Sequence, residues 1–160
     1  MNPHPEEQAK ELWRLGTTQL VQGDVQGAIS LFERSLEVHP TAEGYTFRGW
    51  AVSFLGRYEE AIADCRRAIE IDPEFGNPYN DIGCYLMQQG ELEEAIPWLE
   101  KAKQAKRYDP RHFPYLNLGH IYARVGEPMK ALDEFLKALE LHPGDEVATA
   151  AIEALEFTEH

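Results

Sequence analysis

The 160-residue chain is acidic, with 28 Asp and Glu residues against 15 Lys and Arg residues and a formal net charge of −13. This charge argues against nucleic acids and anionic membrane surfaces as partners, because both need a basic protein surface. The sequence has no apolar run long enough to cross a bilayer and no signal-peptide pattern in its opening MNPHPEEQAKELW. We therefore expect a single-domain cytoplasmic protein.

From its first helical stretch onward, the chain repeats one pattern four times, at spacings of 33, 34 and 36 residues. Each copy has a glycine in a helical stretch, a second glycine seven residues later, an alanine five residues further on, and a helix closed by proline. These three positions are Gly16, Gly49, Gly83 and Gly119, then Gly23, Gly56, Gly90 and Gly126, then Ala28, Ala61, Ala95 and Ala131. A period near 34 residues predicts stacked helix pairs rather than one globular core.

The second copy shows the physical reason for the pattern. Gly49 and Ala61 are small, which allows two antiparallel helices to approach closely, and glycine inside a helix otherwise costs about 1 kcal/mol. Gly56 suits the left-handed residue that ends a first helix, and Pro73 stops the second helix.

This pattern resembles the tetratricopeptide repeat over residues 9–143. The shared positions also include a large residue that opens the first helix, a bulky and then a small residue in the second helix, and a closing proline. In chain order these are Leu12, Tyr45, Tyr79 and Tyr115; Phe32, Cys65, Leu99 and Phe135; Ser35, Ala68, Ala102 and Ala138; and Pro40, Pro73, Pro110 and Pro143. The resemblance implies an all-α fold, an α-solenoid wound as a right-handed superhelix, in one domain over residues 1–160. Its four antiparallel helix pairs would span about residues 9–41, 42–75, 76–111 and 112–143.

Two segments depart from the repeated unit. In the third copy, Pro110 follows Ala102 by eight positions, where the step in the other copies is five, so we expect a longer second helix with Pro97 inside it. After the fourth copy we expect a ninth, capping helix over about residues 145–157, with Asp145 as its N-cap and a frayed end at FTEH. Its apolar stripe would cover the end of the stack, and comprises Val147, Ala151, Ile152 and Leu155.

In tetratricopeptide stacks the first helices line a concave wall, so the resemblance places a binding groove on their unused faces. The second copy carries an extra apolar line there, which is aromatic. The third and fourth copies hold mostly polar residues there, such as Asn77 and Asp81, together with Phe113. We predict a groove for an extended or helical peptide, with aromatic burial and Asn side chains that bind the peptide backbone. Its predicted residues are Trp13, Thr17, Leu20, Phe47, Trp50, Phe54, Asn80, Cys84, Met87, Asn117 and His120. Alternatively, the aromatic side chains fill space between neighbouring first helices, or the groove holds the chain's own N-terminal segment or a second copy.

Some tetratricopeptide co-chaperones bind the acidic tail of heat-shock chaperones through a clamp of Lys, Asn, Asn, Lys and Arg. The corresponding positions here are Trp13, Thr17, Phe47, Asn77 and Asp81, or, one repeat later, Thr46, Trp50, Asp81, Phe113 and Asn117. Neither set contains a cation, and Asp81 would repel a carboxylate. We therefore predict that this chain does not bind such tails.

The sequence predicts no catalytic, cofactor or metal site. The six histidines are scattered, the two cysteines do not form a C-x-x-C pair, and no G-x-S-x-G, phosphate-binding glycine loop or H-E-x-x-H occurs. We expect a non-catalytic adaptor or scaffold that binds a protein or peptide, as a monomer or with weak self-association. Two alternatives remain open: a secretion-type chaperone that shields an apolar client segment, and a self-assembling structural repeat unit.

Overall fold

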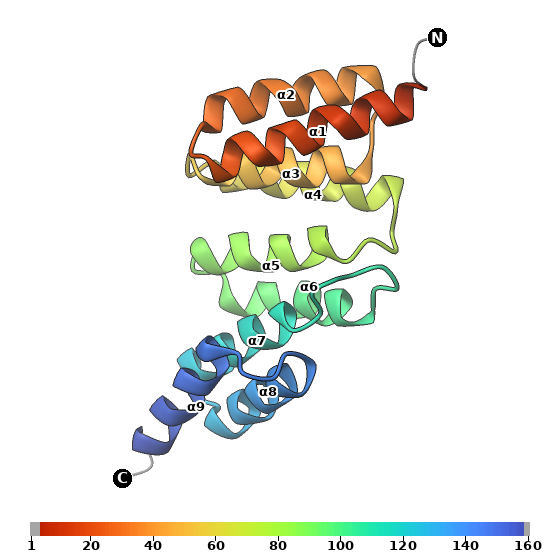
Figure 1. Ribbon diagram of the computed structural model, residues 1–160. Coiled ribbons are helices and arrows are strands. Elements are labelled where there is room, and N and C mark those ends of the chain that lie inside the picture. The colour runs from red at the N-terminus through yellow and green to blue at the C-terminus, as the bar shows by residue number, and fades with distance from the viewer. Residues whose placement is uncertain (1–3, 159–160) are drawn as a thin grey trace.

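The computed structural model describes residues 4–158, and these residues form nine α-helices stacked along one direction (Figure 1). In chain order the helices are α1 (Pro5–Val21), α2 (Val25–Val38), α3 (Ala42–Ser53), α4 (Tyr58–Ile71), α5 (Asn77–Gln88), α6 (Leu92–Gln104), α7 (Phe113–Arg124), α8 (Pro128–Leu141) and α9 (Glu146–Thr158). The predicted all-α repeat fold of four helix pairs and a ninth helix is confirmed.

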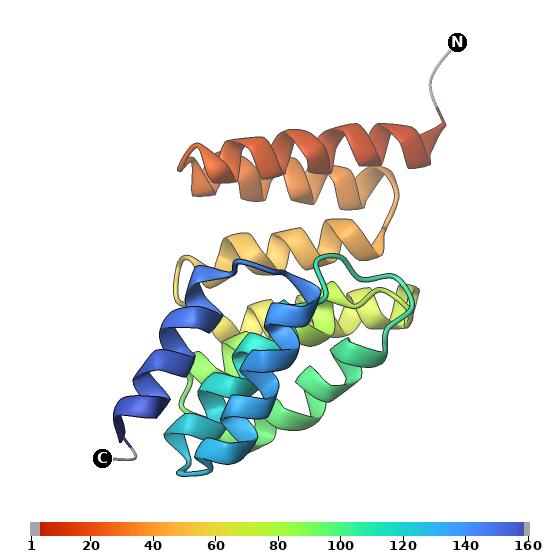
Figure 2. The same ribbon diagram turned by 60° about the horizontal axis from the view of Figure 1, so that its bottom comes forward.

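The helices form a row of antiparallel pairs. Within the pairs, α1 packs on α2, α3 on α4, α5 on α6 and α7 on α8. The first helices α1, α3, α5 and α7 also contact one another in that order, and α9 continues the row by packing on both α7 and α8 (Figure 2). The last helix therefore takes the place that the first helix of a fifth pair would occupy.

Three of the four repeated glycines lie directly beneath a large side chain of the partner helix. An added Cβ would lie 2.5 Å from the Phe32 ring at Gly16, 2.6 Å from Leu99 Cγ at Gly83 and 2.5 Å from the Phe135 ring at Gly119. Gly49 instead faces backbone, 3.0 Å from the Ala61 carbonyl oxygen. Close helix packing thus explains the repeated glycine. Gly56 has the predicted left-handed conformation, with φ of 76°.

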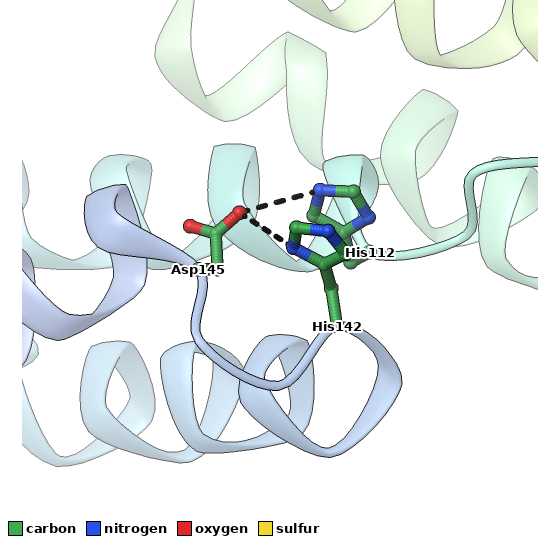
Figure 3. Close-up of side chains that lie close together, drawn as sticks. All are labelled: His112, His142 and Asp145. Carbon is green, nitrogen blue, oxygen red and sulfur yellow. Dashed lines mark hydrogen bonds and ion pairs between the residues drawn. The ribbon is translucent and has the colours of Figure 1, made fainter.

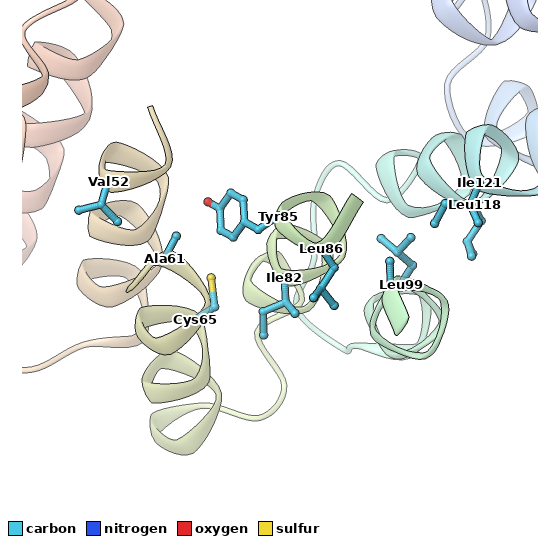
Figure 4. Close-up of a cluster of buried hydrophobic side chains, with 10 residues drawn as sticks. Val52, Ala61, Cys65, Ile82, Tyr85, Leu86, Leu99, Leu118 and Ile121 are labelled. Carbon is cyan, nitrogen blue, oxygen red and sulfur yellow. The ribbon is translucent and has the colours of Figure 1, made fainter. Parts of the chain in front are cut away.

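Buried side chains form a continuous core through the middle of the stack (Figure 4). This core runs from α3 and α4 through α5 to α6 and α7, and contains Val52, Ala61, Cys65, Ile82, Tyr85, Leu86, Ala95, Leu99, Leu118 and Ile121. Separate clusters join α1 to α2 and α3, and α7 and α8 to α9. Because neighbouring pairs share these side chains, the first helices are held at fixed positions along the row.

The prediction of a longer second helix in the third repeat was wrong. α6 includes Pro97 but ends at Gln104, and residues 105–112 form a loop. This loop pairs with the α4–α5 connection: the Gly76 N–H donates to the Arg107 carbonyl and the Arg107 N–H to the Glu74 carbonyl, both at 2.9 Å. Tyr108 packs over Gly76 and is 7% exposed. Burial of this ring and pairing of the loop backbone replace the extra helical turn.

The predicted role of Asp145 is confirmed, because its carboxylate accepts a hydrogen bond from the Ala148 N–H at 2.9 Å. The predicted apolar stripe of α9 was wrong at one position. Val147 is 53% exposed, and Ala148 is fully buried against α8 in its place. α9 extends through residue 158, so only the last two residues of the segment that we expected to fray lie outside the described residues.

Candidate functional site

An open hollow lies on the side of the stack formed by the first helices. It has a volume of about 470 Å³, and its walls come from α3, α5, α7 and the 105–112 loop. The residues that line it are Phe47, Trp50, Asn77, Asn80, Asp81, Cys84, Tyr108, Pro110, Phe113 and Asn117. The fold thus brings five residues of the predicted groove into one concavity: Phe47, Trp50, Asn80, Cys84 and Asn117.

The aromatic rings of the hollow differ in their exposure. Trp50 is 36% exposed and Phe113 43% exposed, so both present ring surface to solvent. Phe47 is half-buried, with its ring centroid 5.2 Å from that of Trp13 and 6.3 Å from that of Phe32. Phe47 therefore fills space between α1 and α3, as the alternative interpretation of the aromatic stripe expected, while Trp50 and Phe113 leave apolar surface uncovered.

Two asparagines from neighbouring repeats are joined by a hydrogen bond in the lining of the hollow. The Asn117 side-chain N–H donates to Asn80 Oδ1 at 2.9 Å and to Cys84 Sγ at 3.2 Å. This contact fixes α7 against α5 and orients both amide groups. Burial raises the pKa of the Cys84 thiol to about 12, so the sulfur is a neutral acceptor rather than a reactive thiolate.

Asp81 is the acidic residue in the lining of the hollow. Within residues 4–158 its carboxylate has no hydrogen-bond or ion-pair partner. Burial raises the pKa of this carboxyl group to about 7, because removal from water disfavours the charged form. A carboxyl group without a partner among the described residues thus lines a concavity that aromatic rings also line.

Three predicted groove residues lie around the hollow but do not line it. Phe54 is 58% exposed and its ring centroid lies 5.7 Å from that of Trp50, so it extends the aromatic surface of α3. Trp13 lines a separate crevice between α1 and the start of α3, which Arg107 also lines. Thr17 bonds its own helix, with its hydroxyl donating to the Arg14 carbonyl at 2.7 Å.

The other three predicted groove residues are used in helix packing. Leu20 is 5% exposed and lies in the core cluster with Phe32. Met87 packs against the central core. The His120 ring stands edge-on to Phe135 with centroids 5.1 Å apart, and burial lowers the pKa of this histidine.

The spacing of the sequence did not identify the loop residues of the hollow. Tyr108 and Pro110 lie in the segment where the third repeat has three extra residues. The irregular spacing of the third repeat was the available signal. The prediction of a longer helix assigned Tyr108 and Pro110 to that helix, whereas they lie in the 105–112 loop.

A second group of titratable side chains lies at the start of α9 (Figure 3). His142 Nδ1 and His112 Nε2 both face Asp145 Oδ2, at 3.1 and 3.4 Å, and the two imidazole rings stack with centroids 4.3 Å apart and planes 12° apart. Burial lowers the pKa of His112, and the hydrogen bond from the Ala148 backbone lowers that of Asp145.

The three ligand atoms of this histidine–aspartate group lie within 4.8 Å of one another, a spacing compatible with a metal ion. The stacked rings are less suitable, because nearly parallel imidazoles direct their in-plane lone pairs side by side rather than toward one ion about 2 Å away. In the observed arrangement the group joins the start of α7, the end of α8 and the start of α9. Sequence reasoning missed it, because no spacing signal connects His112 with a turn 30 residues later.

Comparison with known protein families identifies the same repeat in all four helix pairs. Four family models, each described as tetratricopeptide repeat, match residues 12–42, 42–75, 79–107 and 114–145. The matches follow the four helix pairs and together cover most of the chain.

Several curated proteins are similar in sequence. The small glutamine-rich tetratricopeptide repeat-containing protein 2 of Mycosarcoma maydis is 31% identical over 94 residues, which are 58% of this chain and 27% of that protein. The heat shock protein sti1 homolog of Schizosaccharomyces pombe is 33% identical over 136 residues, 84% of this chain and 21% of that protein. The type IV pilus assembly protein PilF of Pseudomonas aeruginosa is 29% identical over 131 residues, 81% of this chain and 52% of that protein. The chain thus spans about half or less of the length of these relatives.

A solved structure of Pseudomonas aeruginosa PilF superposes with a TM-score of 0.92 at 23% identity, over 98% of this chain and 71% of that one. This similarity shows the fold. In the described part of this chain, none of the helices has the length and apolar character needed to cross a bilayer.

Proposed function

The chain belongs to the tetratricopeptide repeat family, and on that premise we propose that it is a non-catalytic module whose hollow binds a peptide segment of a partner protein. Tetratricopeptide domains bind protein or peptide partners. The observation that carries the proposal is the solvent-exposed aromatic surface of Trp50 and Phe113 inside a concavity built by three consecutive first helices.

The available apolar surface is enough to support binding. A third to a half of a large aromatic side chain is about 80 Å², and its burial contributes about 2 kcal/mol per ring at ~25 cal/mol per Å². Two such rings match the pattern of protein interfaces in which a few aromatic residues contribute most of the binding energy. The Asn77 amide group and the side-chain carbonyl of Asn117, whose N–H groups already bond Asn80 and Cys84, would pair with the backbone of an extended peptide.

The lining of the hollow opposes an acidic ligand. Among residues 4–158, those that line it include Asp81 and no Lys or Arg. The chain is similar to a heat shock protein sti1 homolog, but we propose that it does not bind acidic chaperone tails, because the hollow lacks the cations that such tails require.

A second candidate function is a chaperone that shields an apolar client segment. It is favoured by the ring of Phe54, which lies beside Trp50 outside the hollow and extends the exposed aromatic surface along α3. Co-expression separates the two functions: a chaperone keeps one aggregation-prone client in solution, whereas an adaptor recovers folded partners through a short motif.

The test of the peptide-binding function is selection from a displayed peptide library on the wild type and on Trp50→Ala. Leu136→Ala on α8 is the matched control, because Leu136 is a large apolar side chain that is 46% exposed and does not line the hollow. We expect the wild type and Leu136→Ala to select the same peptides, and Trp50→Ala to bind them at least tenfold more weakly. Equal binding by all three proteins would exclude the hollow as the site. Light scattering across a concentration series tests the third alternative, self-assembly of the repeat unit.

A further inference from the structure

The unpaired Asp81 carboxylate is the feature of the hollow that peptide binding in general does not explain. Asp81 is partly buried and partly removed from water. A carboxylate in such a place is normally hydrogen-bonded or paired with a cation, since loss of hydration without a partner is costly. Asp81 has no such partner within residues 4–158, and Lys and Arg are absent from the lining. The side chain nevertheless lines an open hollow, so a ligand can reach it.

Hydrogen-bond partners are present nearby but are used by other groups. The Asn117 amide group donates to Asn80 and Cys84. These two residues lie in α5, one position before Asp81 and three positions after it. Tyr108, which lines the same hollow, makes no hydrogen bond to Asp81. Within residues 4–158 the fold therefore leaves the carboxylate without a donor, while the amides of Asn80 and Asn117 bond each other.

We propose that the hollow selects peptides that carry a lysine or arginine side chain, which pairs with Asp81 between the aromatic rings of Trp50 and Phe113. This inference rests on the proposed peptide-binding function and names the chemistry of its ligand. The cation supplies the missing partner of the carboxylate, and the aromatic faces that line the hollow are favourable neighbours for a positive charge.

The charge of the whole chain acts in the same direction. A net charge of −13 attracts basic segments and repels acidic ones, which raises the rate of encounter with a cationic peptide at low salt. The position of Asp81 inside the hollow then decides where the cation is placed along the bound peptide.

Binding of a cation should depend on pH through Asp81. The other titratable side chains influenced by its charge are Cys65 of α4, Cys84 and Tyr85 of α5, and Tyr108 of the 105–112 loop. α3 and α7 contribute only non-titratable side chains to the lining. Burial raises the pKa of all four neighbours, so they stay neutral between pH 6 and 8. The Asp81 carboxyl, whose pKa is raised to about 7, therefore gains its charge in this range.

The sign of this dependence follows from linkage. The cation binds the ionised carboxylate, and about one molecule in ten is ionised at pH 6 against nine in ten at pH 8 for a pKa of about 7. The affinity of a cationic peptide should therefore rise about tenfold from pH 6 to pH 8.

The experiment selects random twelve-residue peptides on the wild type, on Asp81→Asn and on Asp133→Asn. Asp133 is the matched control, because it is an exposed aspartate on α8 that does not line the hollow, so its variant has the same change in formal net charge. A peptide selected by the wild type is then resynthesised with citrulline in place of Arg, or norleucine in place of Lys. Its affinity is measured by calorimetry at pH 6 and pH 8, and thermal melts establish that each variant is folded.

We expect a basic residue at one position of the peptides selected by the wild type and by Asp133→Asn, and no such preference for Asp81→Asn. The neutral peptide should bind the wild type at least tenfold more weakly at pH 8, and its affinity should not change with pH. Equal affinity of the neutral and cationic peptides would overturn the inference. If the neutral and cationic peptides bound equally but still required Trp50, the proposed peptide-binding function would stand without the preference for a cation. If the wild type selected no peptide, both would fall.

Discussion

Replacement of Asp81 by Asn should stabilise the free protein, and the gain should increase with pH. The folded carboxyl has a pKa raised to about 7 by burial, against 3.8 for the free group. The folded state therefore holds a proton between these values that the unfolded state has released. Stability from this group is complete below pH 3.8 and is lost as pH rises through 7. Asn keeps the shape of the side chain and never becomes charged.

The size of the effect follows from the protons bound by each state. Between pH 6 and pH 8.5 the unfolded carboxyl is ionised throughout, while the folded group passes from mostly protonated to ionised. At about 1.36 kcal/mol per pH unit, this transition lowers the free energy of unfolding by about 1.4 kcal/mol. For a domain of this length, the corresponding change in Tm is about 3 to 6 °C.

Urea unfolding followed by circular dichroism at pH 6 and pH 8.5 measures this difference in the free energy of unfolding. Both pH values are above the isoelectric point of about 4.8. Subtracting the Asp81→Asn data from the wild-type data removes the contributions of histidines and other groups that titrate in both proteins. We expect the variant to gain about 1.4 kcal/mol over the wild type between the two pH values. A constant difference would show that Asp81 is ionised throughout, and the burial argument would then be wrong.

Three further predictions concern packing and ion pairing. Gly119→Ala places a Cβ 2.5 Å from the Phe135 ring and should cost about 1–3 kcal/mol in urea unfolding; the loss should shrink when Phe135→Leu is added, and strict additivity would argue against the contact. Arg48 forms two hydrogen bonds, at 2.7 and 3.0 Å, with Asp64, which is 8% exposed. Arg48→Met leaves this carboxylate without a partner and should lower the free energy of unfolding by about 2–4 kcal/mol. Adding Asp64→Leu should recover most of this loss. His142→Ala should cost about 1 kcal/mol or less and speed amide hydrogen exchange in α9; unchanged exchange would show that the stacked rings do not hold this helix.

The amino-acid sequence by itself determined the number, type and order of the helices. Helix periodicity, the spacing of Gly49 from Ala61 and the turn glycines are properties of short segments, and four copies of each reinforce the same interpretation. The conformation of Gly56 and the N-cap at Asp145 were predictable for the same reason, because each depends on a few neighbouring residues.

The tertiary structure alone decided which of the candidate side chains share one cavity. Leu20 and Trp50 both had the pattern of groove residues, but Leu20 packs into the cluster that joins α1, α2 and α3, whereas Trp50 stays exposed. The course of the 105–112 loop, which brings Tyr108 to the hollow, depends on backbone pairing with a segment some 30 residues earlier. Asp81 lacks a partner within residues 4–158 because α3, α5, α7 and the 105–112 loop bring no cation and no free hydrogen-bond donor to its carboxylate. Contacts between distant segments arise only when the stack is assembled, and the local periodicity of the chain does not encode them.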